Sequence, residues 1–245
     1  MPLALAAATP FELEHALAGT GWEGQAPGRG TAKTRAAGRD LILVVTGVGP
    51  VNAALEMGAA LSGHDISGVV NIGIAGSFDC ARAPLGAAMA ATAEIYPEYG
   101  VALGDGLASL SGFDFPQWES PGVRVLREIA LDPDGAARSM GLTLGTEVSR
   151  GGFLTVAGVT GSLERASALA GRFSPLAESM EGFALALACL TKGVPFLEVR
   201  TVSNAVGERD RTKWELKQAL AGLGDVLAGL LRGHRQTGSD PSPIS

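Results

Sequence analysis

Few charges, few aromatic residues and very few cysteines distinguish this chain. Its 245 residues include 5% aromatic and 18% charged residues, two cysteines, and a formal net charge of -6. An acidic chain of this kind lacks the electrostatic footprint by which proteins bind nucleic acid or an anionic membrane surface. We therefore expect neither nucleic acid nor a membrane as a partner.

The scarcity of cysteine excludes a disulfide framework and a zinc site. Cys80 and Cys189 lie far apart without a CxxC spacing, and the three histidines are scattered along the chain. We expect no metal and no cofactor. Two reduced thiols are in keeping with a cytoplasmic protein.

Long hydrophobic runs are also missing, because no stretch reaches the ~18 consecutive apolar residues of a membrane span. The apolar residues 1–8 lack the basic segment of a secretory signal and are short for one, so they predict a buried first strand. Residues 232–245 lose the apolar period and are expected to be disordered. The length is typical of one α/β domain, which we expect over residues 1–231.

What the chain does contain is an alternation of strand-like and helix-like apolar segments, typical of parallel βαβ units. Expected strands cover residues 3–7, 41–45, 69–72, 87–95, 152–159 and 196–202. Expected helices cover residues 11–18, 51–61, 162–169, 180–190 and 212–231. Residues 96–121 have no clear period and are expected to form a loop or lid, and residues 126–146 are ambiguous. The predicted fold class is α/β, a single three-layer domain whose mixed, mostly parallel central sheet is flanked by helices.

Two polar residues at element ends point to a binding site. Glu181 stands at the start of an apolar helix, within the sequence SMEGF, and Asn204 ends the strand that follows. If the helix descends and the strand returns, both side chains reach the carboxyl edge of the sheet, where open α/β folds bind ligands. A carboxylate that accepts from ribose hydroxyls and an amide that recognises a purine edge would suit a nucleoside. The structural alternatives are a solvated acid at a helix start and an Asn that stabilises a turn.

Two glycine-rich segments follow expected strands at the same edge. Residues 47–53, GVGPVNA, open a helix, and their amides could bind an anion or a hydroxyl-rich group. A dinucleotide fingerprint is an alternative, but it predicts an acid at the end of the next strand, which has none. Residues 73–77, GIAGS, form a second expected loop where bare backbone could approach a base or sugar, although ordinary turns use the same residues.

The order of these segments, followed by SMEGF and by EVRTVSNAVGERD at residues 198–210, resembles the nucleoside phosphorylase and nucleosidase superfamily. It resembles most closely the futalosine hydrolase branch, over residues 3–231. The resemblance implies that Glu181 binds the ribose hydroxyls and that Met180 lines the sugar pocket, while Ser179 departs from the Glu of related nucleosidases. It also implies a substrate-binding set that includes Gly49, Ile74, Ala75, Gly76, Thr160 and Ser203.

Asn204 replaces the Asp with which adenine-specific members of this superfamily protonate the leaving base. An Asn cannot supply a proton, but its amide can donate to O6 of a 6-oxopurine and accept from N7–H. The resemblance therefore implies hypoxanthine or guanine rather than adenine as the leaving base, with Asn204 as a catalytic residue.

Hydrolysis also requires an activated water, for which the first strand-to-helix segment offers Glu12 and Glu14. We prefer Glu12, although an alignment without gaps to the related nucleosidases could place Phe11 at their catalytic position. The structural alternative is that both acids simply favour the first turn of a helix. Phosphorylases of the superfamily carry an Arg and a Ser where this chain has Asn71 and Ile74. The phosphate site is thus expected to be lost.

A cation inside a strand predicts a structural role. We expect Arg200 to form an ion pair, with Glu198 excluded as its partner on the argument that strand neighbours point to opposite faces.

The resemblance implies, as the preferred function, an N-ribosyl hydrolase that cleaves futalosine to hypoxanthine and dehypoxanthine futalosine in menaquinone biosynthesis. The alternatives are a purine nucleoside phosphorylase and a non-catalytic protein that binds purine nucleosides. The resemblance implies a homo-oligomer, a dimer or higher. The aromatic residues that could line the site of the benzoate-bearing arm are Tyr96, Tyr99, Phe113 and Trp118.

Overall fold

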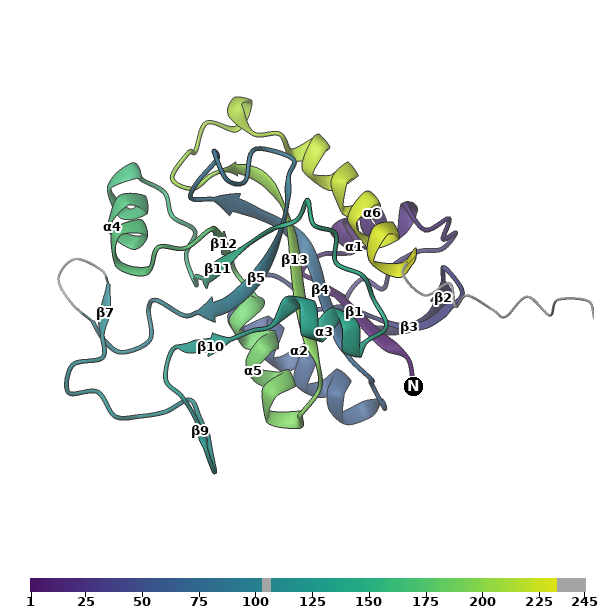
Figure 1. Cartoon of the computed structure of the whole chain (residues 1–245), viewed down its shortest axis with the longest axis horizontal. Helices are drawn as coiled ribbons and strands as arrows, with labels where there is room; N and C mark the ends of the chain where they lie inside the picture. Colours follow the sequence, from purple (N-terminus) through teal and green to yellow (C-terminus); the bar gives the residue numbers. More distant parts are fainter. Residues whose placement is uncertain (103–106, 233–245) are drawn as a thin grey trace, which may run out of the picture.

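The computed structural model describes residues 1–102 and 107–232. In this part of the chain, nine strands form one mixed sheet in the order β10-β5-β11-β12-β4-β1-β3-β2, with β13 pairing β4 and β5 (Figure 1). The strands are β1 (Leu3–Ala7), β2 (Gly30–Ala36), β3 (Arg39–Val45), β4 (Val69–Ser77), β5 (Ala88–Ile95), β10 (Glu128–Ala130), β11 (Ser149–Thr155), β12 (Ala177–Ser179) and β13 (Phe196–Ala205).

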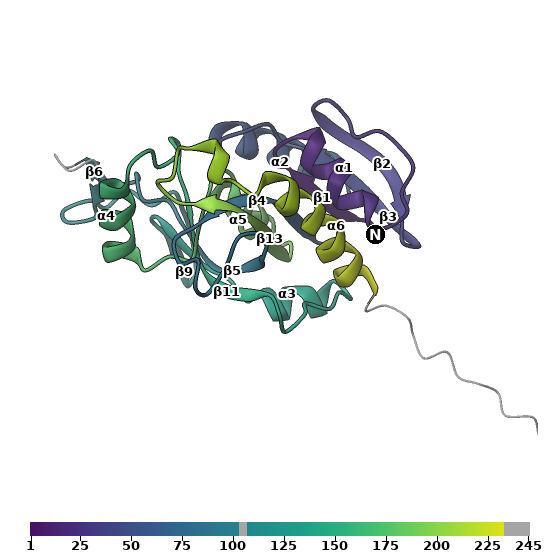
Figure 2. The same cartoon turned by 90° about the horizontal axis from the view of Figure 1, so that it is seen from above.

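Helices cover the sheet, and two small hairpins extend from it. The helices are α1 (Pro10–Ala18), α2 (Pro50–Gly63), α3 (Pro133–Ser139), α4 (Leu163–Phe173), α5 (Gly182–Lys192) and α6 (Leu216–Arg232), with a 3-10 turn at Arg211–Lys213. The hairpins pair β6 (Val101–Ala102) with β7 (Ala108–Ser109) and β8 (Trp118–Ser120) with β9 (Val123–Val125). Two perpendicular views place α4 at one end of the molecule and α1 with α6 at the other (Figures 1 and 2). None of the helices in these residues is long and apolar enough to cross a bilayer.

The sheet is buried on both faces, which explains the near-continuous apolar strands. In β1, Leu3 and Leu5 face α1, α3 and α6, whereas Ala4 and Ala6 face α2 and α5. Successive side chains of a strand point to opposite faces, so a strand with both sets buried needs a helical layer on each side. This arrangement confirms the predicted α/β class with a mixed central sheet and flanking helices.

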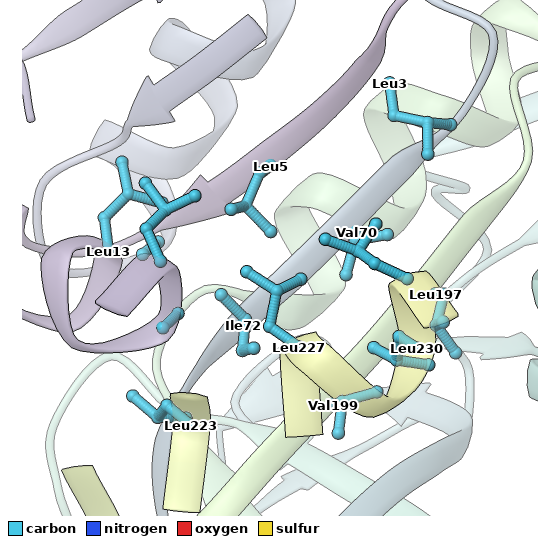
Figure 3. Close-up of a cluster of buried hydrophobic side chains, with 14 of the residues drawn as sticks. Leu3, Leu5, Leu13, Val70, Ile72, Leu197, Val199, Leu223, Leu227 and Leu230 are labelled. Carbon is cyan, nitrogen blue, oxygen red and sulfur yellow. The ribbon is translucent and has the colours of Figure 1, made fainter. Parts of the chain in front are cut away.

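The larger core cluster packs α6 and α1 against the strands in the middle of the sheet (Figure 3). Leu223, Leu227 and Leu230 recur at helical spacing along α6, so one stripe of the helix meets the sheet. That stripe contacts alternate residues of β4 and β13, among them Ile72 and Val199. The packing fixes the strand ends that carry the site residues.

The four strands β3, β1, β4 and β13 are parallel neighbours. Their carboxyl ends therefore meet at one edge, as predicted, and this is the edge where α/β sheets bind ligands. Strand β5 runs antiparallel to β13, and β12 runs antiparallel to β4, so the sheet is mixed beyond this parallel centre.

Several element boundaries differ from the expectation. Strand β4 continues to Ser77, so residues 73–77 are not a loop; they pair with β13 and, at Gly76 and Ser77, with β12. Helix α5 begins at Gly182, two residues later than expected, and α6 begins at Leu216. Strand β11 ends at Thr155, before the expected end at residue 159.

Strands β2 and β12 of the sheet lie in segments where no element was expected. Strand β2 alternates half-buried and exposed residues and pairs with β3 at the edge of the sheet, so it lacks the apolar signal of a central strand. Strand β12 has three residues, too few for any period.

The irregular middle of the chain contains more structure than a loop. Residues 96–121 include β6, β7 and β8, with residues 103–106 outside the described part, and residues 126–146 include β10 and α3. Of the expected disordered tail at 232–245, Arg232 is the last residue of α6, and residues 233–245 lie outside the described part.

Candidate active site

A cavity of about 340 Å³ opens at the carboxyl ends of β1, β4 and β13. Its size suits a small molecule rather than a macromolecule. Of the ten predicted site residues, the cavity is lined by Glu12, Ile74, Ala75, Gly76, Thr160, Met180, Glu181, Ser203 and Asn204. The tenth, Gly49, is not among the lining residues.

Glu181 occupies the N-cap of α5 and is 4% exposed. Its Oε1 accepts a hydrogen bond of 3.0 Å from the Gly49 backbone N–H, and Arg200 Nη2 lies 3.4 Å from its Oε2. Burial raises the pKa of the Glu181 carboxyl, while Arg200 and the Gly49 amide oppose the rise. The site therefore holds an oriented carboxylate whose remaining lone pairs can accept from ligand hydroxyls.

The loop at residues 47–53 was expected to offer its amides to an anion or a hydroxyl-rich ligand, and the Gly49 amide contacts a carboxylate of the protein. Gly49 has a φ of +94°, which a residue with a side chain rarely adopts. Its N–H donates to Glu181. The loop thus orients the carboxylate of Glu181, a lining residue of the cavity.

Three donors, two of them from Thr9, hold the carboxylate of Glu12 at the start of α1. Its Oε2 accepts from the backbone N–H and hydroxyl of Thr9, at 3.1 and 2.8 Å, while Thr9 caps the helix by accepting from the Glu12 N–H. Its Oε1 accepts from the Ile74 N–H of β4 at 3.1 Å. Glu14, by contrast, accepts from the Ala26 N–H and does not line the cavity. Phe11 lines the cavity and is 55% exposed.

Arg200 is 1% exposed, and its Nε donates to Glu198 Oε1 at 2.8 Å. The expectation that excluded Glu198 was wrong, because residues two apart on a strand point to the same face. The guanidinium also lies beside Gly73: a Cβ there would come within 2.4 Å of Arg200 Nη1 and 2.7 Å of Glu12 Oε1. Only glycine leaves room for both side chains.

Asn204 lies at a bulge in β13, because the register with β4 shifts between Val202 and Asn204. A bulge places successive residues on the same side of a strand, and here both Ser203 and Asn204 line the cavity. Asn204 Oδ1 accepts from the Ser203 hydroxyl at 2.7 Å, and Nδ2 donates to the Ala205 carbonyl at 2.9 Å. The Ser203 hydroxyl thereby orients the amide.

Glu178 is a buried acid of the cavity that the sequence reasoning missed. Its carboxylate accepts from the Thr160 N–H at 2.8 Å and from the Thr160 hydroxyl. Burial raises its pKa, against these two hydrogen bonds. On β4, Gly76 pairs with Glu178 of β12 on one side and with Asn204 of β13 on the other. The two side chains therefore flank a bare glycine in one row across three strands.

Several further lining residues come from the segment after β13. They include Arg209 and Trp214, with the Arg209 guanidinium 5.6 Å from the Trp214 ring centroid. Their signal was available in the sequence, since they lie in the segment between the strand that carries Asn204 and the closing helix α6. The four aromatic residues proposed for the benzoate-bearing arm do not line this cavity. Tyr96 lines a separate hollow beside α5, and Tyr99 packs against Phe113.

Comparisons with known proteins agree with this fold. Residues 2–232 match the model of the phosphorylase superfamily. The chain is 36% identical to a futalosine hydrolase of Streptomyces coelicolor over 77% of each chain. It is 34% identical to a futalosine hydrolase of Thermus thermophilus, over 79% of this chain and 82% of that one.

A solved structure extends the comparison to the fold. A 5'-methylthioadenosine/S-adenosylhomocysteine nucleosidase of Helicobacter pylori, in complex with butyl-thio-DADMe-Immucillin-A, superposes with a TM-score of 0.72. The match covers 93% of this chain and 96% of that one at 20% identity, and so compares the fold alone. The chain belongs to the phosphorylase superfamily and, within it, to the family of the futalosine hydrolases.

Proposed function

We propose that the protein is an N-ribosyl hydrolase that cleaves futalosine to hypoxanthine and dehypoxanthine futalosine, a step of menaquinone biosynthesis. The relatives of Streptomyces coelicolor and Thermus thermophilus, both described as futalosine hydrolases, support this activity. The observation that carries it is one cavity in which Glu12, Glu181 and Asn204 converge from α1, α5 and β13.

The three residues have separate roles in the proposed reaction. Glu181 accepts hydrogen bonds from the ribose hydroxyls, which favours positive charge developing on the sugar. Glu12 orients a water and accepts its proton as the water attacks the anomeric carbon. Asn204 stabilises the base as it departs as an anion. The base then takes a proton from solvent, and the proton on Glu12 returns to solvent, so no side chain has to donate a full proton to the base. The transition state is then oxocarbenium-like, with carboxylates around the sugar and an amide at the base.

The row formed by Glu178, Gly76 and Asn204 supports a 6-oxopurine as the base. Adjacent strands lie about 4.8 Å apart, so the outer two residues are separated by roughly twice that distance. A flat base over Gly76 would accept at O6 from the Asn204 amide N–H and donate its N1–H to the Glu178 carboxylate. Adenine has no hydrogen on N1, so its lone pair would face the carboxylate unfavourably. The row thus favours hypoxanthine over adenine.

The alternative of a phosphorylase requires cations or hydroxyls that bind phosphate. Arg200, the buried cation of the cavity, is already bonded to Glu198 and lies beside Glu181. Carboxylates around a cation disfavour a second anion at the same place. These contacts support hydrolysis rather than phosphorolysis.

We further propose that the protein is a cytoplasmic homo-oligomer. Support comes from an apolar hollow beside α2 and α5, lined by Val51, Leu55, Phe183 and Leu187. Val51 and Leu55 are 72% and 62% exposed, which is unusual for neighbouring large aliphatic residues unless another chain covers them. Sedimentation equilibrium should give a mass of at least two chains of 24.9 kDa each, and the mass of one chain would contradict the oligomer. The two free thiols are in keeping with the cytoplasm.

A substrate panel tests the proposed activity. Purified protein is incubated with futalosine, its 6-amino analogue, inosine and methylthioadenosine, each with and without phosphate, and free base is followed by chromatography. We expect hypoxanthine from futalosine at the same rate in both buffers. A strict phosphate requirement would identify a phosphorylase instead, and tight nucleoside binding without release of base would identify a binding protein.

A further inference from the structure

Two carboxyl groups that the proposed chemistry does not use adjoin Gly182, the residue after Glu181. Glu94 of β5 and Glu198 of β13 are both 0% exposed. A Cβ placed on Gly182 would come within 2.3 Å of Glu94 Oε1 and within 2.2 Å of Glu198 Oε2. Both oxygens therefore adjoin the same point at the start of α5.

The other oxygen of each group has a partner. Thr155 Oγ1 donates to Glu94 Oε2 at 2.6 Å, and Arg200 Nε donates to Glu198 Oε1 at 2.8 Å. Within the described residues, no donor reaches Glu94 Oε1 or Glu198 Oε2. Two ionised oxygens that adjoin each other without donors, out of contact with water, would repel strongly. A single proton shared between the two oxygens gives each of them a hydrogen-bond partner.

We propose that Glu94 is a protonated carboxylic acid at neutral pH, that it donates to Glu198, and that it is a positioning residue for Glu181. The positioning role rests on the proposed function, in which Glu181 binds the ribose. The shared proton rests on the contacts of the two acids alone.

The charges around the pair favour the protonated form of Glu94. Glu12, Glu181 and Glu198 face the single guanidinium of Arg200, so an ionised Glu94 would add a fourth carboxylate to one cation. Burial raises the pKa of Glu94 well above its usual value, and the charge of Glu198 and the hydrogen bond to it raise it further. The Thr155 hydroxyl and Arg200 act in the opposite direction. The residue in register with Glu198 on β4 is Asn71, a buried neutral amide that adds no charge to the pair.

A continuous series of hydrogen bonds connects this proton to the ribose site. The Phe183 N–H donates to Thr155 Oγ1 at 2.7 Å, and the same hydroxyl donates to Glu94. Glu94 then donates to Glu198, which holds Arg200 beside Glu181. Because Phe183 lies two residues after Glu181, the series begins and ends in the first turn of α5. Its loss should free Glu181 to move, which would weaken substrate binding more than turnover.

The variant Glu94→Gln tests the proton, because its amide can donate to Glu198 and accept from Thr155 just as a protonated Glu does. We expect kcat/KM for futalosine within about threefold of wild type. Infrared spectroscopy should detect the carbonyl stretch of a protonated carboxylic acid in the wild type at neutral pH, lost in this variant. If the wild type has no such band, or if Glu94→Gln retains it, the shared proton is refuted.

The variant Glu94→Leu tests the positioning role, because it keeps the volume and removes both hydrogen bonds. We expect KM for futalosine to rise about tenfold or more, with a smaller change in kcat. A folded Glu94→Leu with wild-type KM would overturn the role. If this variant does not fold, Glu198→Gln replaces it and should raise KM in the same way, since it weakens the hold on Arg200. Should the wild type cleave no nucleoside, the proposed function fails. The infrared band still shows whether Glu94 is protonated.

Discussion

Glu178 and Asn204 lie in one row of the sheet, each in register with the glycine that separates them. The row has no side chain at its centre, an acid at one end and an amide at the other. Both outer residues line the same cavity. In the proposed reaction, the choice of base is then a property of two side chains that can be exchanged one at a time.

Changing either end of the row should relax the preference for a 6-oxopurine. In Glu178→Gln the amide can rotate and donate to N1 of adenine, and in Asn204→Asp the acid can protonate N7. We expect the ratio of kcat/KM for futalosine to that for its 6-amino analogue to fall about tenfold or more in each variant. The matched control is Glu164→Gln on the exposed surface of α4. Ratios equal to wild type in both variants would show that the row does not recognise the base.

Glu12 and Glu14 provide a matched pair for the water-activating acid. Glu12→Gln should lower kcat about 10²- to 10⁴-fold, because an amide cannot accept the proton of the attacking water. Glu14→Gln should have nearly wild-type kcat, since a glutamine oxygen can still accept from the Ala26 N–H. Single-turnover release of hypoxanthine measures the step directly. A large loss in Glu14→Gln with none in Glu12→Gln would reverse the assignment.

The contact of Gly73 with Arg200 and Glu12 predicts a strong effect from one methyl group. Gly73→Ala should displace Arg200 Nη1 and Glu12 Oε1, at a cost of about 1–3 kcal/mol in the free energy of unfolding. The activity should fall about 100-fold, because both site carboxylates depend on these positions. Gly58→Ala in α2, where a Cβ meets nothing within 4 Å, is the control and should be neutral or stabilising. Unfolding in urea and kcat/KM together distinguish the two variants.

The raised pKa of Glu94 predicts how stability depends on pH. A carboxyl whose pKa is higher in the folded state binds its proton more tightly there. Its contribution is therefore fully present below the pKa of the unfolded chain and is lost as pH rises through the folded pKa. Glu94→Gln cannot lose a proton, so its free energy of unfolding relative to wild type should increase with pH. Urea denaturation across a pH series measures this, and parallel curves would contradict the prediction.

The residues that the sequence placed correctly at the cavity are those at the ends of strongly apolar elements. Glu181, Asn204 and Glu12 each follow or open such an element, so the position of the element carries the side chain to the sheet edge. The predicted order of strands and helices was sufficient because parallel strands have a common carboxyl edge.

The residues that the sequence missed depend on pairing between distant segments. Glu178 lies on a three-residue strand that has no period of its own, and its place beside β4 is set by neighbours. Glu94 and Glu198 are 104 positions apart and meet because β5 pairs with β13. The exclusion of Glu198 as a partner of Arg200 was a mistake of strand parity, and could have been avoided from the sequence alone.

The most direct test of the account follows the oxygen that attacks the sugar. Futalosine is incubated with the wild-type protein in phosphate-containing buffer made with water labelled by a heavy oxygen isotope, and the products are analysed by mass spectrometry. We predict free hypoxanthine and dehypoxanthine futalosine that carries one labelled oxygen on the anomeric carbon. A sugar product that carries phosphate on that carbon, or hypoxanthine release that stops when phosphate is removed, would contradict hydrolysis by this site.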